Sequence, residues 1–251
     1  MRTCTYDNLE YNGRLANQFW QVAATASRAV DLDAVPRFRP DWSYREFTSL
    51  PEEFYDPPGE VVWDGGTNYF QELQFIENVK DDVHWWFTPP EEALELITYP
   101  EGWGEVRWKI SLHVRRGDYL KYPRHFPMPT ERYYRTALGL AQAELPDAQV
   151  FVFSDDPEWC RSKFPDCTVV EGVTTPVDVG ERVDKPMDWV DLFLMSCCDA
   201  NVLANSTFSW WGAYLGLQDL VYYPSKWFGP PVPNHERWKY AMPDDWKMIQ
   251  C

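Results

Sequence analysis

The second half of the chain alternates between short apolar runs and longer helical patterns, and this alternation constrains the fold more than any other feature. Runs typical of strands occur at 106–112, 149–153, 168–170, 201–204 and 221–223. Patterns typical of helices occur between them, at 130–145, 157–163, 189–199 and 208–217. Strands that alternate with helices at this spacing form a parallel sheet with helices on both faces, so the sequence predicts an α/β fold.

The first half of the chain is less regular. An Ala-rich segment at 19–29 has the period of a helix, whereas 31–60 is rich in Pro, Asp and aromatic residues and is typical of loops with short elements. A strand is expected at 61–63, and helices are expected at 70–79 and 89–97.

Composition excludes several classes of protein. With 45% hydrophobic residues the chain is globular, and its net charge of −16 argues against a nucleic-acid partner, although a few local arginines can still hold a nucleotide. The amino terminus lacks the apolar core of a signal peptide and no 18-residue apolar stretch occurs, so we expect no integral membrane segment and a cytoplasmic location. The six cysteines form no CxxC pair, which predicts free thiols and no metal site.

Polar motifs follow three of the expected strands. These are HVRRGDY at 113–119, SDD at 154–156 and NSTF at 205–208. Ligands of parallel sheets bind beyond the carboxyl ends of the strands, and three polar motifs on one edge favour a binding site there.

The first motif carries the chemistry of an anion site. Arg115 and Arg116 offer planar forks of donors that match phosphate oxygens, and Gly117 allows close approach of the backbone. Asp118 can hold an arginine in place or receive a sugar hydroxyl. A surface loop with a salt bridge explains the same residues equally well.

The other two motifs have two interpretations each. Asp155 and Asp156 can accept hydrogen bonds from a ribose or a guanine edge, or they can cap the next helix; a ligand role is favoured for Asp155, and the two are balanced for Asp156. The turn at 205–208 begins a helix whose dipole suits phosphate. The adjacent Trp210 and Trp211 are expected to pack in the core rather than stack on a sugar.

A glycine turn, NGRLANQ at 12–18, precedes the first expected helix. Gly13 and Arg14 lie in the turn, and Asn17 and Gln18 add amide donors at the positive end of the helix dipole. For this segment alone, a helix cap is the favoured interpretation.

Taken in order, these motifs, together with LMSC at 194–197 and ANSTFSWWGAYL at 204–215, resemble family 11 glycosyltransferases, the α-1,2-fucosyltransferases of bacteria, viruses and animals. The resemblance covers nearly the whole chain. It implies a GT-B fold of two facing Rossmann-like domains with parallel sheets, GDP-fucose as donor, inversion at the anomeric carbon and no required metal. Ala16 and Thr207 depart from the family's pattern, which usually has glycine and serine there.

The resemblance also implies residue roles. Arg115 and Arg116 would hold the donor pyrophosphate, His113 would shape that pocket, and Asn17 would lie close to the transferred sugar. The expected catalytic residues are Arg115, Arg116, Asp118 and Asn17. The expected donor-binding residues are Gly13, Arg14, Asn17, Gln18, His113, Arg115, Arg116, Ser154, Asp155, Asp156, Asn205, Ser206, Thr207 and Phe208.

We therefore expect an acceptor-side domain at 1–108, a GDP-fucose-binding domain at 109–235 and a packed tail at 236–251. The expected reaction is metal-independent transfer of L-fucose to the 2-hydroxyl of a terminal galactoside of an oligosaccharide, with Asp118 or Glu72 as candidate bases. Another fucosyl linkage, a protein O-fucosyltransferase and a catalytically silent sugar-binding module remain open. Five aromatic residues could line an acceptor groove, although packing is favoured for most of them: Trp63, Tyr69, Phe70, Trp85 and Trp86.

Overall fold

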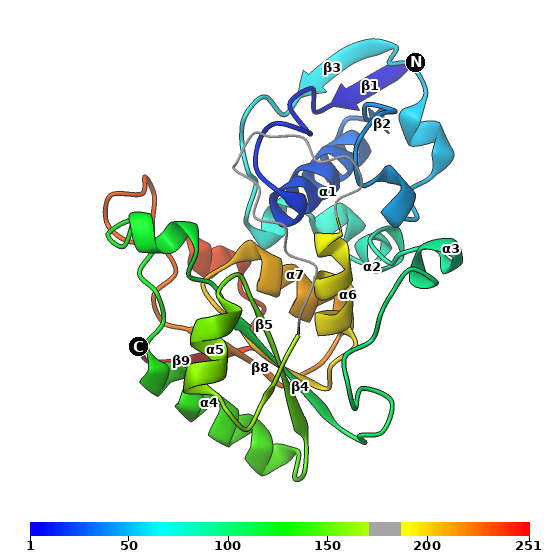
Figure 1. Cartoon of the computed structure of the whole chain (residues 1–251). Coiled ribbons are helices and arrows are strands. Elements are labelled where there is room, and N and C mark those ends of the chain that lie inside the picture. The colour runs from blue at the N-terminus through cyan, green and yellow to red at the C-terminus, as the bar shows by residue number, and fades with distance from the viewer. Residues whose placement is uncertain (171–186) are drawn as a thin grey trace. The chain divides into compact units, whose positions relative to one another are not determined.

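The structure, a computed structural model, describes residues 1–170 and 187–251 (Figure 1). Its described residues divide into two compact units, one of 1–97, 187–189 and 239–241 and the other of 98–170, 190–238 and 242–251. The chain first passes from one unit to the other after residue 97, whereas the expected domain boundary followed residue 108. The residues of the expected tail, 236–251, are divided between the two units.

The first unit is built on a three-stranded parallel sheet in the order β2–β1–β3. These strands are β1 (Arg2–Thr5), β2 (Val35–Arg37) and β3 (Glu60–Asp64), and the sequence predicted only the third. Helix α1 (Leu15–Asp31) extends the expected helix at both ends and buries most of its Ala-rich length. The small alanine side chains allow this close packing on all sides of the helix.

Short elements complete the first unit. They are the 3-10 turns η1 (Arg45–Phe47), η2 (Glu52–Tyr55), η3 (Leu73–Phe75) and η4 (Glu77–Val79), with the short helices α2 (Asp82–Trp86) and α3 (Glu91–Leu94). The expected helix at 70–79 is wrong, because Phe70 has a φ of +55° that cannot begin a right-handed helix. The helix expected at 89–97 is reduced to the four residues of α3.

The second unit contains the parallel sheet that the sequence predicts. Six strands lie in the order β6–β5–β4–β7–β8–β9, and every pairing is parallel. Their bounds are β4 (Lys109–Val114), β5 (Gln149–Ser154), β6 (Thr168–Val169), β7 (Ala200–Val202), β8 (Val221–Pro224) and β9 (Lys247–Ile249). The edge strand β9 is the one that the sequence did not predict.

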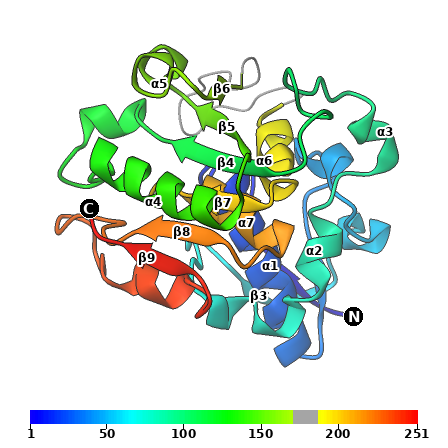
Figure 2. The ribbon, with the colours of Figure 1, turned by 90° about the horizontal axis from the view of Figure 1, so that it is seen from below.

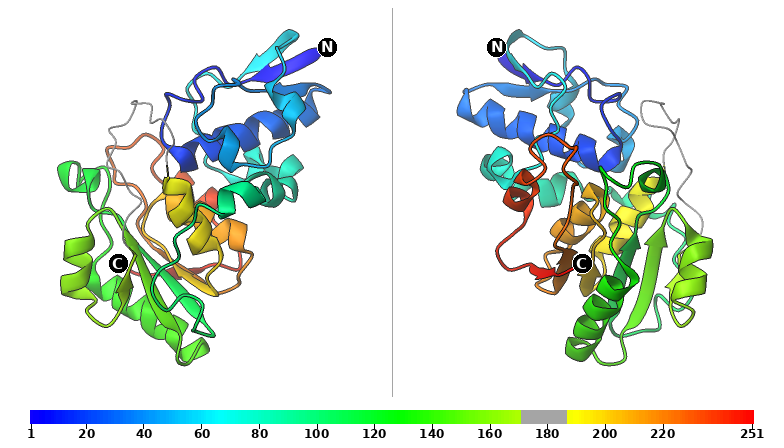
Figure 3. Two further views of the ribbon diagram at one scale, coloured as in Figure 1. Left: turned by 45° about the vertical axis from the view of Figure 1, so that its right-hand side comes forward. Right: turned by 90° about the vertical axis from the view of Figure 1, so that its left-hand side faces the viewer.

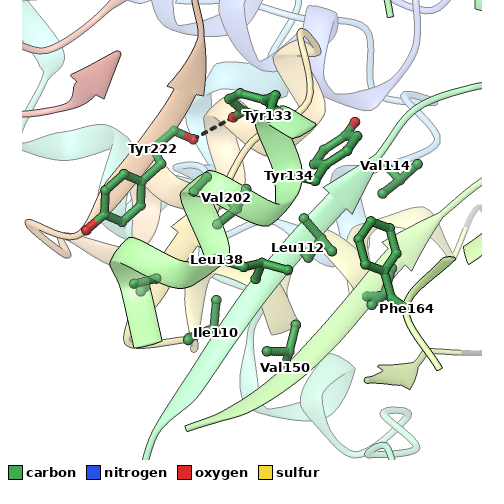
Figure 4. Close-up of a cluster of buried hydrophobic side chains, with 14 of the residues drawn as sticks. Ile110, Leu112, Val114, Tyr133, Tyr134, Leu138, Val150, Phe164, Val202 and Tyr222 are labelled. Carbon is green, nitrogen blue, oxygen red and sulfur yellow. Dashed lines mark hydrogen bonds between the residues drawn. The ribbon is translucent and has the colours of Figure 1, made fainter. Parts of the chain in front are cut away.

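Helices cover both faces of this sheet (Figures 2 and 3). Helices α4 (Glu131–Glu144) and α5 (Pro157–Lys163) share one face, where they pack into a common apolar cluster with β4 and β5 (Figure 4). Helices α6 (Asp188–Ser196) and α7 (Thr207–Gly216) lie on the other face and approach closely at Gly212. A Cβ added at Gly212 would stand 2.8 Å from the Cβ of Met195, so the close packing requires glycine there. No helix within the described residues combines the length and the apolar character needed to cross a membrane.

The strand order reverses beside β4. From β4 the chain moves to β5 and β6 on one side, and β7 then continues the sheet on the other side of β4. Such a reversal opens a crevice at the carboxyl ends of the two strands, which is where open α/β sheets bind their ligands. The topology therefore predicts a ligand site at the segments that follow β4 and β7.

Candidate functional site

The three polar motifs meet at the carboxyl end of β4. The backbone N–H groups of Arg116 and Gly117 donate to the carboxylate of Asp155 at 2.8 and 3.1 Å, which ties β4 to β5. On the other side, the hydroxyl of Tyr119 donates to the carbonyl of Asn205 at 2.9 Å, which ties β4 to the segment after β7. The expectation that these motifs share one edge of the sheet is confirmed.

Arg115 is clamped between two carboxylates. Its Nη2 donates to Asp118 at 2.6 Å and its Nη1 lies 2.8 Å from the carboxylate of Asp155. Burial by itself would lower the pKa of Arg115, but the charges of Asp155 and Asp118 outweigh it and raise that pKa above its usual value. Both terminal nitrogens of this guanidinium are thus engaged by protein groups.

Arg116 is held in a different way. Its Nε–H donates to Asp156 at 2.8 Å, and its guanidinium carbon lies 4.2 Å from the centre of the Trp159 ring. The carboxylate fixes one edge of the planar group and the indole supports one face. The fork formed by its two terminal nitrogens is directed away from the Nε that Asp156 holds. Of the two arginines, Arg116 therefore has the geometry of a ligand-binding group.

The two carboxylates after β5, those of Asp155 and Asp156, bind other groups of the protein. Asp156 accepts the backbone N–H of Trp159 at 3.2 Å and so caps α5, as one of its two interpretations predicted. Asp155 accepts three protein donors, from Arg115, Arg116 and Gly117. A Cβ at Gly117 would come within 2.7 Å of Asp155, so this close contact requires glycine. A nucleoside contact of either carboxylate stays a prediction.

The segment after β7 ends in a helix amino terminus. Ser206 is the N-cap of α7, and its hydroxyl accepts the backbone N–H of Phe208 at 3.3 Å. The buried amide of Asn205 donates to the carbonyl of Trp227 at 2.8 Å, which fixes the turn. The positive end of α7 therefore lies on the same edge of the sheet as the segment that carries the arginines, to which Tyr119 links it. Further along this helix, Trp210 and Trp211 are buried, and the prediction that they pack in the core is confirmed.

His113 is the first residue of the first motif, and the centre of its ring lies 5.6 Å from the centre of the Phe208 ring. Burial, and then the charge of Arg115, lower the pKa of His113 to about 3, so the imidazole is neutral at physiological pH. Its Nδ1 is buried and has no hydrogen-bond partner among the described residues. A buried polar atom without a partner is costly, and a ligand that reaches it would remove that cost.

The glycine turn belongs to the first unit. Gly13 has a φ of +94°, and a Cβ there would stand 2.5 Å from the amide nitrogen of Asn17, so both conformation and space demand glycine. The buried Gln18 donates to the carbonyl of Gly13 at 3.0 Å and accepts from the indole of Trp42 at 2.6 Å. Arg14 is the N-cap residue of α1, and its side chain makes no capping hydrogen bond to the first turn of the helix.

Asn17 and Arg14 are positioned by residues that the sequence did not single out. Gln71 donates to the amide oxygen of Asn17 at 2.9 Å. Arg14 lies 3.8 Å from Asp188, which also accepts the hydroxyl of Tyr44 at 2.8 Å. These partners are distant in sequence and belong to no motif, so only the fold reveals them.

Two aromatic residues of the site received no role from the sequence. Tyr119 closes the first motif and Trp159 follows Asp156 by three residues, where a helix places it beside the strand end. The candidate bases have partners as well: Asp118 accepts from Arg115, and the buried Glu72 accepts from Gln74 at 2.7 Å. Within the described parts of the chain, no three His, Cys, Asp or Glu side chains gather as metal ligands.

Comparison with known proteins gives a consistent result. The family model described as glycosyl transferase family 11 matches residues 102–247. The chain is 35% identical over 131 residues to an α-1,2-colitosyltransferase of Escherichia coli, a match that covers 47% of this chain and 41% of that protein. It is 29% identical over 192 residues to galactoside α-(1,2)-fucosyltransferase 1 of Alouatta belzebul, a match that covers 72% of this chain and 48% of that protein. The chain thus spans about half the length of the curated relatives it matches.

Among solved structures, the chain is similar to a mutant FUT1 of Arabidopsis thaliana in complex with GDP. The TM-score is 0.53 at 16% identity, and the match covers 92% of this chain and 72% of that one. At this identity the likeness shows the fold, and the α/β GT-B fold with parallel sheets is the one expected from the sequence.

Proposed function

The chain belongs to glycosyl transferase family 11, and we propose that it transfers L-fucose from GDP-fucose to the 2-hydroxyl of a terminal galactoside on a glycan acceptor. The observation that carries this proposal is the guanidinium of Arg116, which Asp156 and Trp159 fix at the carboxyl end of β4, on the same edge of the sheet as the amino terminus of α7. A diphosphate matches that arrangement, since both groups favour negative charge. The names of the relatives, one a galactoside α-(1,2)-fucosyltransferase, support the sugar and the linkage.

In this proposal the donor pyrophosphate is bound by three kinds of group. The fork of Arg116 takes two oxygens, the N–H groups at the start of α7 take others, and the buried Nδ1 of His113 gains a partner. Arg115 acts behind them as a positioning residue, because its own fork is held by Asp118 and Asp155. A carboxylate has about four lone-pair sites, so Asp155 retains one for a nucleoside after its three protein bonds.

The reaction is a single displacement with inversion. The acceptor hydroxyl oxygen forms a bond to C1 of fucose while the bond from C1 to the β-phosphate oxygen breaks, and GDP leaves with both bonding electrons. Negative charge that builds on the β-phosphate is offset by Arg116 and the α7 N–H groups, which are already in place before the reaction. These donors supply the stabilisation that a metal supplies in other glycosyl transfers, so we propose that no metal is required.

The acceptor proton must pass to a base or to water. Asp118 and Glu72 are the candidates, and in the structure Asp118 is the more exposed carboxylate while Glu72 is buried. Asn17, held by Gln71, would orient a sugar hydroxyl by hydrogen bonding rather than take a proton, since an amide is not a base at neutral pH.

A second candidate differs in the transferred sugar. One relative is named an α-1,2-colitosyltransferase and is 35% identical over its matched residues. Arg116 and the amino terminus of α7 would bind the diphosphate, which both donors share, so these groups do not distinguish fucose from colitose. Parallel reactions with GDP-fucose and GDP-colitose would distinguish them.

Two measurements test the proposal. Calorimetry in the presence of EDTA should show binding of GDP, and binding of another nucleotide in its place would refute the donor. Mass spectrometry should show one added deoxyhexose on a β-galactoside acceptor and release of GDP. Binding of GDP-fucose without any GDP release across a panel of acceptors would instead identify a silent binding module.

A further inference from the structure

A pocket lies within the first unit, away from the glycine turn. Its volume is about 330 Å³, within the range of small-molecule sites. The last two turns of α1 form one side, and β3 and the segment around η3 form the other. Every lining residue belongs to the first unit.

Three aromatic rings form one wall of the pocket: Trp63, Phe70 and Phe75. The centres of the Trp63 and Phe70 rings are 5.7 Å apart, and those of Phe70 and Phe75 are 5.4 Å apart in an edge-to-face arrangement. Phe75 is 36% exposed and the other two are partly exposed, so ring surface faces solvent. Two of the five aromatic residues that the sequence suggested for an acceptor groove thus line this pocket.

The opposite side is polar and balanced in charge. Arg28 donates to Asp31 at 3.3 Å, and the amide of Asn78 donates to the other oxygen of Asp31 at 2.8 Å. Asn78 also donates to the carbonyl of Ser27 at 3.1 Å, which fixes η4 against α1. The pocket therefore presents one guanidinium, one carboxylate and the amide of Gln74 near its aromatic wall.

The pocket begins about two turns of α1 beyond the glycine turn. Ala24, the first residue of α1 that lines it, follows Asn17 by 7 residues on one continuous helix. A helix rises 1.5 Å per residue, so the two side chains originate about 10 Å apart along the axis. On the other side of the pocket, Phe70 precedes Gln71, which donates to Asn17, so a ligand longer than one sugar ring would be needed to fill the pocket and reach Asn17 as well.

We propose that the pocket is a second saccharide subsite, which binds a neutral sugar ring of an extended glycan at a distance from the reacting galactoside. A pyranose has an apolar face of C–H groups and a rim of hydroxyls, and these match the aromatic wall and the polar side chains opposite it. Arg28 and Asp31 have opposite charges, so the lining has no preference for an anion or a cation. The assignment of the ligand as part of the acceptor rests on the proposed function, whereas its saccharide class does not.

Binding without a donor tests the saccharide class directly. An array of neutral, β-galactoside-terminated oligosaccharides should retain the protein, and Trp63→Ala should weaken the best ligand about 10-fold, as expected for one lost ring contact. Trp85→Ala is the matched control, because Trp85 is an exposed tryptophan of the same unit that does not line the pocket. If no glycan on the array shows binding that depends on Trp63, the inference is wrong.

Kinetics test whether the subsite serves the acceptor. With lacto-N-neotetraose the KM of Trp63→Ala and of Phe75→Ala should rise about 10-fold with kcat unchanged, while the KM for methyl β-galactoside should not move. An equal rise for both acceptors would show a structural effect and overturn the subsite. If no acceptor is fucosylated at all, the proposed function fails, and the array alone decides the inference. A change of mass in sedimentation on Trp63→Ala would show that a second copy of the chain fills the pocket and would also overturn it.

Discussion

Replacement of Arg116 by lysine isolates the contribution of its donor fork. The substitution keeps a positive charge but removes the planar group that Asp156 and Trp159 hold in place. Loss of one preorganised donor to a developing charge costs about 2.7–4 kcal/mol of barrier, or about 100–1,000-fold in rate. The Arg116 side chain donates its Nε–H to Asp156, and its backbone N–H, which the substitution keeps, donates to Asp155. Arg116→Lys should therefore lose turnover on that scale and remain folded.

Arg115→Lys should mainly lower the stability of the fold, in contrast to Arg116→Lys. Both terminal nitrogens of Arg115 bind carboxylates, and a lysine ammonium can satisfy Asp118 or Asp155 but not both in the same geometry. A hydrogen bond to a charged group contributes about 1.5–3 kcal/mol. The Arg115 side chain is 21% exposed, so solvent screens little of this loss. At about 2–4 °C per kcal/mol, the melting temperature should fall by about 3–12 °C.

Initial rates with GDP-fucose, calorimetric GDP binding and thermal denaturation on both variants provide the test. Arg135→Lys is the control, since Arg135 forms an exposed pair on α4 that belongs to no site. Near-normal turnover in both Arg115→Lys and Arg116→Lys would remove the arginines from the mechanism. An unstable Arg116→Lys with a stable Arg115→Lys would reverse the roles inferred from their partners.

Three further predictions concern the stability of the fold and the state of the cysteines. The pKa of His113 is about 3 in the folded protein and about 6.5 in the unfolded chain, so between these pH values the unfolded chain binds one more proton than the folded protein. The free energy of unfolding should therefore fall as the pH drops from 6.5 towards 3, by up to about 1.4 kcal/mol per pH unit. Denaturant titrations measure this slope, and His113→Gln should flatten it. Tyr119→Phe leaves the carbonyl of Asn205 without its donor and should cost about 1–3 kcal/mol of unfolding free energy by the same measurement; an unchanged value would show that the link between β4 and α7 is dispensable. All six cysteines are free in the structure, so thiol titration after denaturation without reductant should count six, whereas a count near two would mean that disulfides form.

The sequence predicted the second unit well because its elements carry strong local signals. Helix α5 occupies the expected residues 157–163, since Asp156 caps it and Pro157 begins it. The strands that were missed have weak signals: β1 is a four-residue strand with alternating threonines, β2 contains Pro36 at a sheet edge, and β9 has three residues. Such strands form because a neighbouring strand is available, which no local pattern records.

The candidate site was predictable in its location but not in its internal arrangement. Parallel strands bring the ends of β4, β5 and β7 to one edge, and that rule alone places the three motifs together. Which carboxylate binds which arginine depends on the register that sets His113 beside Phe153 and Val114 beside Ser154. The pocket of the first unit was harder still to predict from the sequence, because the left-handed conformation of Phe70 interrupts the helix expected at 70–79.

The charge balance of the site leads to a last prediction, on salt. The guanidinium groups of Arg115 and Arg116 face the carboxylates of Asp118, Asp155 and Asp156, so two positive charges are set against three negative ones. The whole chain has a net charge of −16, so its field does not attract a nucleotide from a distance. In the proposed function, affinity for GDP must then come from short, directed hydrogen bonds, which salt screens weakly. We expect the Kd of GDP to change less than about twofold between about 0.05 and 0.5 M NaCl, because added ions shorten the Debye length and weaken long-range repulsion rather than a long-range attraction. Calorimetry across this range is the test. A tenfold weakening would mean that cationic charge outside this network drives binding, and Arg116 would no longer be the main side-chain contact to the diphosphate.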